Sequence, residues 1–159
     1  MMGSMALFLS SHINRLDKKG RISVPAPFRA ELVRDTFHGV VLFKSNNHPC
    51  LEGFTWSYMQ GISDRLDDFN LFSDEQDDLA ASIFGSAVQL SLDGDGRIIL
   101  PSDLIEFASL DDNAAFVGMG TKFQIWNPTS FDERKKAARQ NIQDNKLTIP
   151  QITKGRSND

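Results

Sequence analysis

The chain contains one short phrase twice, and this internal repeat restricts its fold more than any other feature. The stretch LDKKGRISVP begins at Leu16, and the stretch LDGDGRIILP begins at Leu92, 76 positions later. In each copy a glycine, Gly20 or Gly96, separates two short apolar runs, and glycine readily adopts the positive φ that a tight turn requires. Each phrase therefore predicts a β-hairpin, and their likeness predicts two related structural units.

The segments that flank the two copies match as well. Each copy predicts the order strand, turn, strand, short helix, strand, strand, helix, with a proline at the start of the short helix. The expected strands are residues 12–16, 22–24, 39–45, 51–54, 86–92, 98–100, 114–120 and 123–126. The expected helices are residues 25–33, 55–69, 73–85, 101–110 and 128–140. Ser73 and Ser102 are expected to cap two of these helices.

These matches divide the chain into five segments. We expect a cloning remnant at residues 1–4, a first repeat at residues 5–70, a connecting helix at residues 71–86, a second repeat at residues 87–141 and a polar tail at residues 142–159. Each repeat alone is too short to bury a large core, so we expect the two to pack together across a pseudo-twofold axis. The predicted fold class is α+β, mainly β.

Charge is distributed unevenly along the chain, although the formal net charge is only −4. Residues 1–50 carry +4, residues 51–96 carry −9 and residues 97–159 carry +1. Phosphate binding depends on a local basic patch more than on the total, so the acidic balance does not exclude nucleic acid as a partner. On charge alone, a solvated acidic helix beside an ordinary surface explains the pattern equally well.

The two phrases differ most in the charge of their turns, DKKGR in the first copy and DGDGR in the second. In both, the aspartate can accept turn N–H groups while the arginine folds back toward it, so a stabilising role is the default expectation. The residues given this structural role are Asp17, Asp93, Gly96 and Arg97. Only the first turn is basic enough to contact phosphates or base edges. The candidate DNA contacts are Arg15, Lys18, Lys19, Gly20 and Arg21, and Arg29 lies beyond them as part of the same basic cluster.

Four stretches together resemble the MraZ family, which is similar to AbrB-type regulators. They are the twin phrases, Pro25 to Arg29, His48 to Glu52 and Phe123 to Trp126, and the resemblance covers about Met5 to Gln140. It implies two tandem, pseudo-twofold swapped-hairpin β-barrel repeats with flanking helices. This chain has Gly53 where family members carry a further hydrophobic residue, which concerns strand packing more than function.

The resemblance also implies a function. It predicts a bacterial transcriptional regulator that binds short direct repeats of double-stranded DNA in the promoter of the division and cell-wall gene cluster, which includes its own gene. It further implies a ring-shaped homo-oligomer of roughly eight or more subunits. Arg21 becomes the expected essential contact, either a phosphate clamp or a guanine reader, and the sequence leaves both open. Whether the second motif contacts DNA or an adjacent subunit also stays open. Asp95 makes that motif acidic, which favours a structural or subunit-interface role over a DNA contact.

Other classes of site find little support in the sequence. A single cysteine, Cys50, excludes an intrachain disulfide, and three scattered histidines give no zinc spacing. The stretch that begins at Asp93 lacks the glycine and glutamate of a calcium loop. We therefore expect no metal and no cofactor. Without a secretory signal or an apolar stretch of ~20 residues, we expect a cytoplasmic protein with no membrane partner. The resemblance to DNA-binding regulators implies that it is also nucleoid-associated.

Two alternatives to DNA binding remain at this point. A ring scaffold could act through proteins that dock on the acidic region of residues 64–78. An enzyme could use Asp17 or Asp93 as an acid or base, but no second carboxylate or nucleophile supports such chemistry, and we expect no enzymatic activity.

Overall fold

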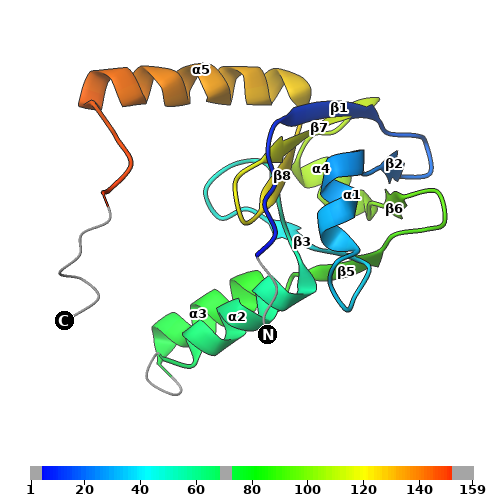
Figure 1. Ribbon diagram of the computed structural model, residues 1–159, viewed down its shortest axis with the longest axis horizontal. Coiled ribbons are helices and arrows are strands. Elements are labelled where there is room, and N and C mark those ends of the chain that lie inside the picture. Colours follow the sequence, from blue (N-terminus) through cyan, green and yellow to red (C-terminus); the bar gives the residue numbers. More distant parts are fainter. Residues whose placement is uncertain (1–4, 69–72, 152–159) are drawn as a thin grey trace. The chain divides into compact units, whose positions relative to one another are not determined.

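The computed structural model describes residues 5–68 and 73–151 (Figure 1). The expected cloning remnant therefore lies outside the described residues, as does the end of the polar tail from residue 152. The chain forms two compact units, Met1–Pro128 and Thr129–Asp159. The first unit contains all of the strands described below, and the second consists mainly of one helix.

The first unit alternates strands and helices in the predicted order. Its strands are β1 (Ser11–Arg15), β2 (Arg21–Ser23), β3 (Gly39–Lys44), β4 (Leu51–Phe54), β5 (Val88–Ser91), β6 (Arg97–Ile99), β7 (Asn113–Gly118) and β8 (Phe123–Trp126). Its helices are α1 (Ala26–Leu32), α2 (Trp56–Leu66), α3 (Asp74–Ile83) and α4 (Ser102–Phe107). All strand pairs are antiparallel. The α+β class with mainly sheet is confirmed.

The strands on either side of each glycine turn do not pair as hairpins, and in this respect the sequence prediction was wrong. Strand β1 pairs with β7, β5 pairs with β3, and β2 pairs with β6, so every one of these partners comes from the other copy. Within the first copy only an isolated bridge joins Leu16 to Ile22. Each turn is closed at its base, but β7 and β3, with six residues each, offer β1 and β5 more backbone partners than the three-residue strands β2 and β6 could in local hairpins.

The resulting strand order is the same in both directions. The six-stranded sheet runs β1-β7-β8-β4-β3-β5. Exchanging each strand with its counterpart in the other copy, β1 with β5, β3 with β7 and β4 with β8, gives the same order read from the opposite edge. A separate two-stranded ribbon joins β2 to β6, with Ile22 directly opposite Ile98. In the same way Glu52 of β4 lies opposite Gln124 of β8. Both pairs consist of equivalent residues of the two copies.

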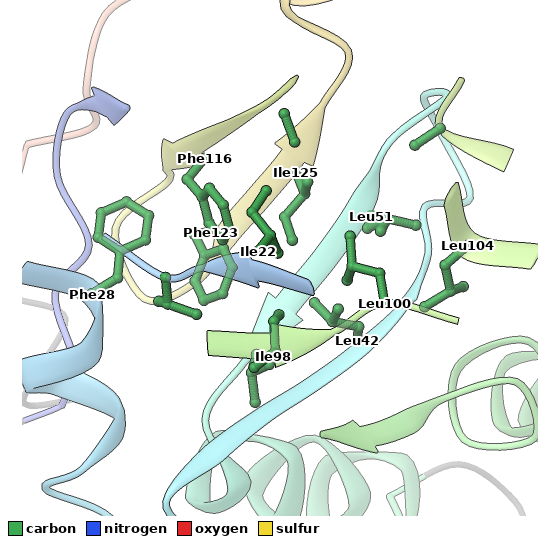
Figure 2. Packing of buried hydrophobic residues seen from close by; sticks show 14 of the residues in the cluster. Ile22, Phe28, Leu42, Leu51, Ile98, Leu100, Leu104, Phe116, Phe123 and Ile125 are labelled. Atoms are coloured by element: carbon green, nitrogen blue, oxygen red, sulfur yellow. The ribbon is translucent and has the colours of Figure 1, made fainter. Parts of the chain in front are cut away.

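One apolar core receives side chains from both copies (Figure 2). The fully buried residues include Ile22, Phe28, Leu42, Leu51, Ile98, Leu104, Phe116, Phe123 and Ile125. Phe8 and Phe28 form an edge-on pair with ring centroids 5.3 Å apart, and Phe8 meets Phe123 at 5.1 Å. Such aromatic pairs add about 0.5–1.5 kcal/mol each beyond the area they bury. The core therefore locks the two copies together.

The structure also explains why glycine stands at position 53. A Cβ added to Gly53 would lie 2.8 Å from ring atoms of Phe123 and 3.2 Å from Leu42 Cδ2. Real Cβ atoms essentially never approach carbon so closely, because van der Waals repulsion is already steep at that distance. The ring of Phe123 thus fills the space that a larger residue would need.

Two local predictions about the helices need correction, and one is confirmed. The Ser73 side chain accepts a hydrogen bond from the Gln76 backbone N–H at 3.2 Å, as a cap of α3 should. Ser102 does not cap α4, because it is already the first helical residue and Pro101 occupies the cap position. The last helix, α5 (Pro128–Asn145), continues past residue 140 into the segment expected to be a polar tail.

A buried polar pair lies where β4 meets β8. The Gln124 Nε2 group donates to both carboxylate oxygens of Glu52, at 3.1 and 3.2 Å, and the Lys122 ammonium lies 2.9 Å from the same carboxylate. The Trp126 indole N–H donates to Gln124 Oε1 at 2.8 Å. The glutamine therefore satisfies a buried carboxylate and an indole at once, which a second glutamate could not do.

We expect the substitution Gln124→Glu to lower the free energy of unfolding by about 2 kcal/mol at neutral pH, because it replaces a charge-assisted hydrogen bond with a second buried carboxylate. The loss should shrink in mildly acidic buffer, where one of the two carboxyls takes up a proton. Urea unfolding at both pH values measures it. Gln60→Glu, at an exposed position of α2, is the matched control. Equal urea midpoints for wild type and Gln124→Glu would contradict the role of this pair.

Candidate nucleic-acid interface

The first Asp-x-x-x-Arg turn is closed by its own aspartate. Asp17 Oδ1 accepts hydrogen bonds from the backbone N–H groups of Lys19 and Arg21, both at 2.9 Å. Its other oxygen, Oδ2, accepts from the Arg21 side-chain Nε at 2.8 Å. Backbone bonds from Asp17 N to Arg21 O and from Gly20 N to Asp17 O complete the turn. One carboxylate therefore fixes both the turn and the direction of the arginine.

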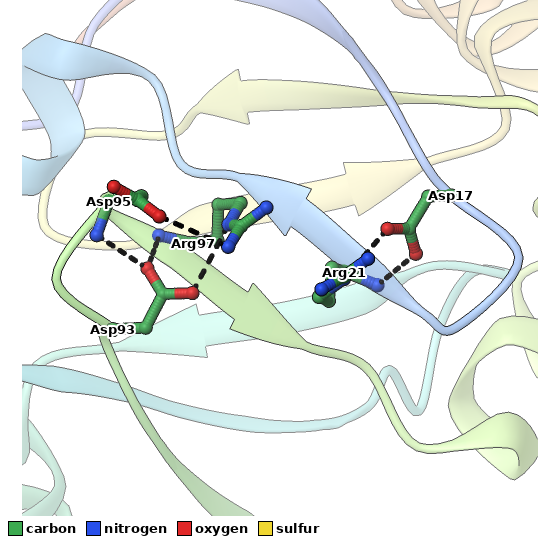
Figure 3. A network of polar contacts seen from close by, with 5 residues as sticks. All are labelled: Asp17, Arg21, Asp93, Asp95 and Arg97. Carbon is green, nitrogen blue, oxygen red and sulfur yellow. Dashed lines mark hydrogen bonds and ion pairs between the residues drawn. The ribbon is translucent and has the colours of Figure 1, made fainter.

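The second turn repeats this geometry bond for bond (Figure 3). Asp93 Oδ1 accepts from the backbone N–H groups of Asp95 and Arg97 at 2.8 and 2.9 Å, and Oδ2 accepts from the Arg97 Nε at 3.1 Å. One contact is additional: Arg97 Nη2 lies 3.2 Å from Asp95 Oδ2. The guanidinium of Arg97 is thus held by two carboxylates, whereas that of Arg21 is held by one.

Each turn is fastened to the other copy through its glycine. The Gly20 carbonyl accepts from Leu100 N at 2.8 Å, and the Gly96 carbonyl accepts from Val24 N at 3.0 Å. Gly20 and Gly96 have φ of +85° and +76°, a conformation in which other residues are strained. A Cβ on Gly20 would also lie 2.7 Å from Leu100 O. Glycine is therefore required both for the turn and for the close approach between the copies.

The ribbon of β2 and β6 presents one face to the core and one to solvent. Ile22 and Ile98 are each 1% exposed and face the core. Because strand side chains alternate, the other residues of both strands project from the opposite face. That outer face consists of Arg21, Ser23, Arg97 and Ile99, with Arg21 opposite Ile99 and Ser23 opposite Arg97. In Figure 3 both arginines lie over this ribbon, between the two turns.

The two turns differ in charge and in the freedom of their cations. Lys18 and Lys19 are exposed, so the first turn carries a formal charge of +2 from Asp17 to Arg21. The second turn, from Asp93 to Arg97, carries −1. Since the backbones match, side-chain charge is the main difference a polyanion would meet. The first turn attracts it and the second repels it.

The structure places the predicted site residues in two groups. One group lies in the first turn, which Asp17 closes, and consists of Lys18, Lys19, Gly20 and Arg21. Arg15, also exposed, lies just before the turn but belongs to β1 of the six-stranded sheet, opposite Asn113.

Sequence reasoning missed two residues of this site, Ser23 and Ile99, and it grouped Arg29 with the basic first turn, whereas the structure places the Arg29 side chain against Gly96 of the second turn. Ser23 and Ile99 share the outer face with the arginines, and the apolar alternation of the strands could have shown which side they take. Arg29 donates to the Val24 carbonyl at 2.5 Å, and its side chain lies against Gly96, where an added Cβ would be 2.5 Å from Arg29 Cδ. Arg29 thus supports the second turn, a contact between the two copies that the local sequence does not reveal.

Hydrogen bonding lowers the pKa of both turn aspartates. The Arg21 backbone N–H contributes most to holding the pKa of Asp17 below its ordinary value; partial burial opposes it, and the Arg21 side chain and the Lys19 N–H assist. For Asp93 the Arg97 backbone N–H likewise comes first, opposed by burial and assisted by the Asp95 N–H and the Arg97 side chain. Both turns therefore keep their carboxylates ionised under ordinary conditions.

The described residues, 5–68 and 73–151, show no metal-binding cluster and no helix suited to crossing a membrane. No three His, Cys, Asp or Glu side chains in these ranges are grouped so that they could hold a metal ion. No helix there is long and apolar enough to cross a membrane. The one cysteine, Cys50, is buried and not in a disulfide.

Comparison with known proteins gives a consistent result. Residues 83–149 match the family model described as "MraZ protein, putative antitoxin-like". A protein of Gluconobacter oxydans named Transcriptional regulator MraZ is 46% identical over 85% of this chain and 84% of its own length. Proteins of the same name from Rickettsia akari and Gluconacetobacter diazotrophicus are 39% and 44% identical, over 91% and 85% of this chain and 97% and 87% of their own lengths.

We expect the carboxyl groups of Asp17 and Asp93 to titrate below the ordinary aspartate value of about 4, as followed by carbon NMR. Because the folded pKa is lowered, their contribution to stability is present above that ordinary value and is lost as the pH falls through the lowered one. The substitution Arg21→Ala should leave most of the shift at Asp17, since the backbone N–H remains. A return of Asp17 to the ordinary pKa in this variant would show that the ion pair governs the turn instead.

Proposed function

This chain belongs to the MraZ family of transcriptional regulators, and from that premise we propose that it regulates transcription by binding double-stranded DNA through its first Asp-x-x-x-Arg turn. The sites it recognises are short direct repeats in the promoter of the division and cell-wall gene cluster, including its own gene. It acts in the cytoplasm on the nucleoid, by binding and without catalysis. Lys18, Lys19 and Arg21 make the contacts, the buried Gly20 shapes the turn that presents them, and Arg15 adds to the local field.

One observation carries this proposal: two turns of the same backbone geometry differ in charge. A motif that is only structural would need just the aspartate, glycine and arginine that both turns share, with no preference for charge at the two positions between aspartate and glycine. Instead, the turn in which Arg21 has one carboxylate partner carries two exposed lysines. The turn in which Arg97 has two carboxylate partners carries an additional aspartate, Asp95. A phosphate backbone binds to clustered exposed cations and releases its counterions, which favours the first turn alone.

We also propose that the first unit is a pair of tandem, pseudo-twofold swapped-hairpin repeats of the AbrB type. Its strand order is unchanged when the copies are exchanged, and β1, β2, β5 and β6 each pair with a strand of the other copy. The registers agree as well, since Ile22 meets Ile98 and Glu52 meets Gln124. This arrangement holds both turns on one ribbon.

A single basic turn offers few phosphate contacts, so one chain alone should bind weakly and lose affinity steeply with salt. We propose that the chain assembles into a ring-shaped homo-oligomer, in which several turns act on one DNA molecule and raise the effective concentration of the next contact. Direct repeats about one helical turn apart would present their sites on the same face of the duplex.

We expect Arg21→Ala to weaken binding to the upstream region of the chain's own gene by about 1–3 kcal/mol per contact, in gel-shift titrations at two salt concentrations. The matched comparison is Arg97→Ala, which removes the equivalent side chain from the acidic turn and should cost much less. Lys18→Ala and Lys19→Ala should each reduce the salt dependence by about one phosphate contact. Wild-type affinity in Arg21→Ala, or an equal loss in Arg97→Ala, would remove the basis for assigning the first turn.

We expect native mass spectrometry to find a closed assembly of roughly eight or more copies. Leu7, Leu9 and Ile13, on or beside edge strand β1, are 57%, 60% and 63% exposed, which is typical of a surface that pairs. Ile13→Lys should reduce the assembly to smaller species without unfolding the chain. Val33→Lys, at a position that is 45% exposed after α1, is the control. A wild-type chain found only as a monomer would rule out the ring.

A further inference from the structure

We propose that Ile99 is a specificity-determining residue, which contacts the methyl group of a thymine in the major groove and gives each bound DNA element a direction. The inference rests on the proposed function, because it concerns how the same site distinguishes sequences. It assigns a role to a residue outside both Asp-x-x-x-Arg motifs.

The position of Ile99 is the first argument. Ile99 lies directly across the ribbon from Arg21, on the outer face, and is 59% exposed. Its neighbour Ile98 is 1% exposed and supplies the apolar contact of this strand with the core, so packing of the core does not explain an isoleucine at position 99. The exposed Ile99 side chain is therefore available to contact the same stretch of DNA as Arg21.

The shape and charge of the face are the second argument. A two-stranded β-ribbon fits into the major groove of B-form DNA, where the edges of the bases are distinguishable. On the outer face of β2 and β6, Arg21 adjoins the exposed lysines of the first turn, so the charge at this end of the ribbon complements the phosphates that border the groove. Thymine alone among the four bases presents a methyl group there, and an apolar side chain is its natural contact.

The asymmetry of the face is the third argument. Exchanging the two copies superimposes Arg21 on Arg97 and Ser23 on Ile99. A face with the same residue in both halves would favour a palindrome. Here one half presents a hydroxyl and the other a branched aliphatic group. The methyl contact therefore forms on one side only, which suits a directly repeated element better than an inverted one.

The test uses the full-length chain and the duplex that it selects from a randomised library. Each thymine of that duplex is replaced in turn by deoxyuridine, which lacks only the 5-methyl group, and affinity is measured for wild type, Ile99→Ala and Ile142→Ala. The last is the matched control, an isoleucine of α5 that is 50% exposed. We expect one thymine in each repeat at which deoxyuridine weakens wild-type binding about fourfold, the effect of removing one methyl group from apolar contact.

At that thymine Ile99→Ala should show no further loss, while Ile142→Ala should respond as the wild type does. A duplex insensitive to deoxyuridine, an undiminished response in Ile99→Ala, or sensitivity at two positions related by inversion would overturn the inference and leave the proposed function standing. If the wild-type chain selects no duplex, the proposed function and the inference both fall. Circular dichroism of each variant establishes that the exposed substitutions leave the fold intact.

Discussion

The pairing of β2 with β6, centred on Ile22 opposite Ile98, is the contact on which the rest of the site depends. Both isoleucines are buried, so a shift in register by one residue would turn them to solvent and bring the arginines into the core. That register determines where each turn ends and which residues share the outer face. The carbonyls of Gly20 and Gly96 then anchor each turn to the opposite strand.

Around this contact the two copies form a symmetric scaffold with asymmetric side chains. In the core the symmetry is broken at Glu52 and Gln124, where the second copy supplies an amide that satisfies the carboxylate of the first. On the surface it is broken at the turns, where Lys18 and Lys19 stand in place of Gly94 and Asp95. The first difference makes the two halves complementary, and the second leaves a single basic turn available for a polyanion.

Much of this could be predicted from the sequence because it depends on neighbouring residues. The order of elements follows from local alternation, and the bonds from Asp17 to its own turn span only four positions. Strand pairing could not be read this way, because β1 meets β7 and β5 meets β3 through contacts about a hundred and about fifty positions apart, and local hairpins were wrongly expected. The support of Gly96 by Arg29 and the shared face of Arg21 and Ile99 were missed for the same reason.

The two turns share one backbone geometry, and we propose that side-chain charge alone selects the first as the one that binds DNA. The most direct measurement exchanges their charges. In one variant Lys18→Gly and Lys19→Asp make the first turn acidic, and in a second Gly94→Lys and Asp95→Lys are added; a Cβ at position 94 meets nothing within 4 Å. DNA affinity and its salt dependence should disappear in the first variant and return in the second. A folded second variant that still fails to bind DNA would contradict the account.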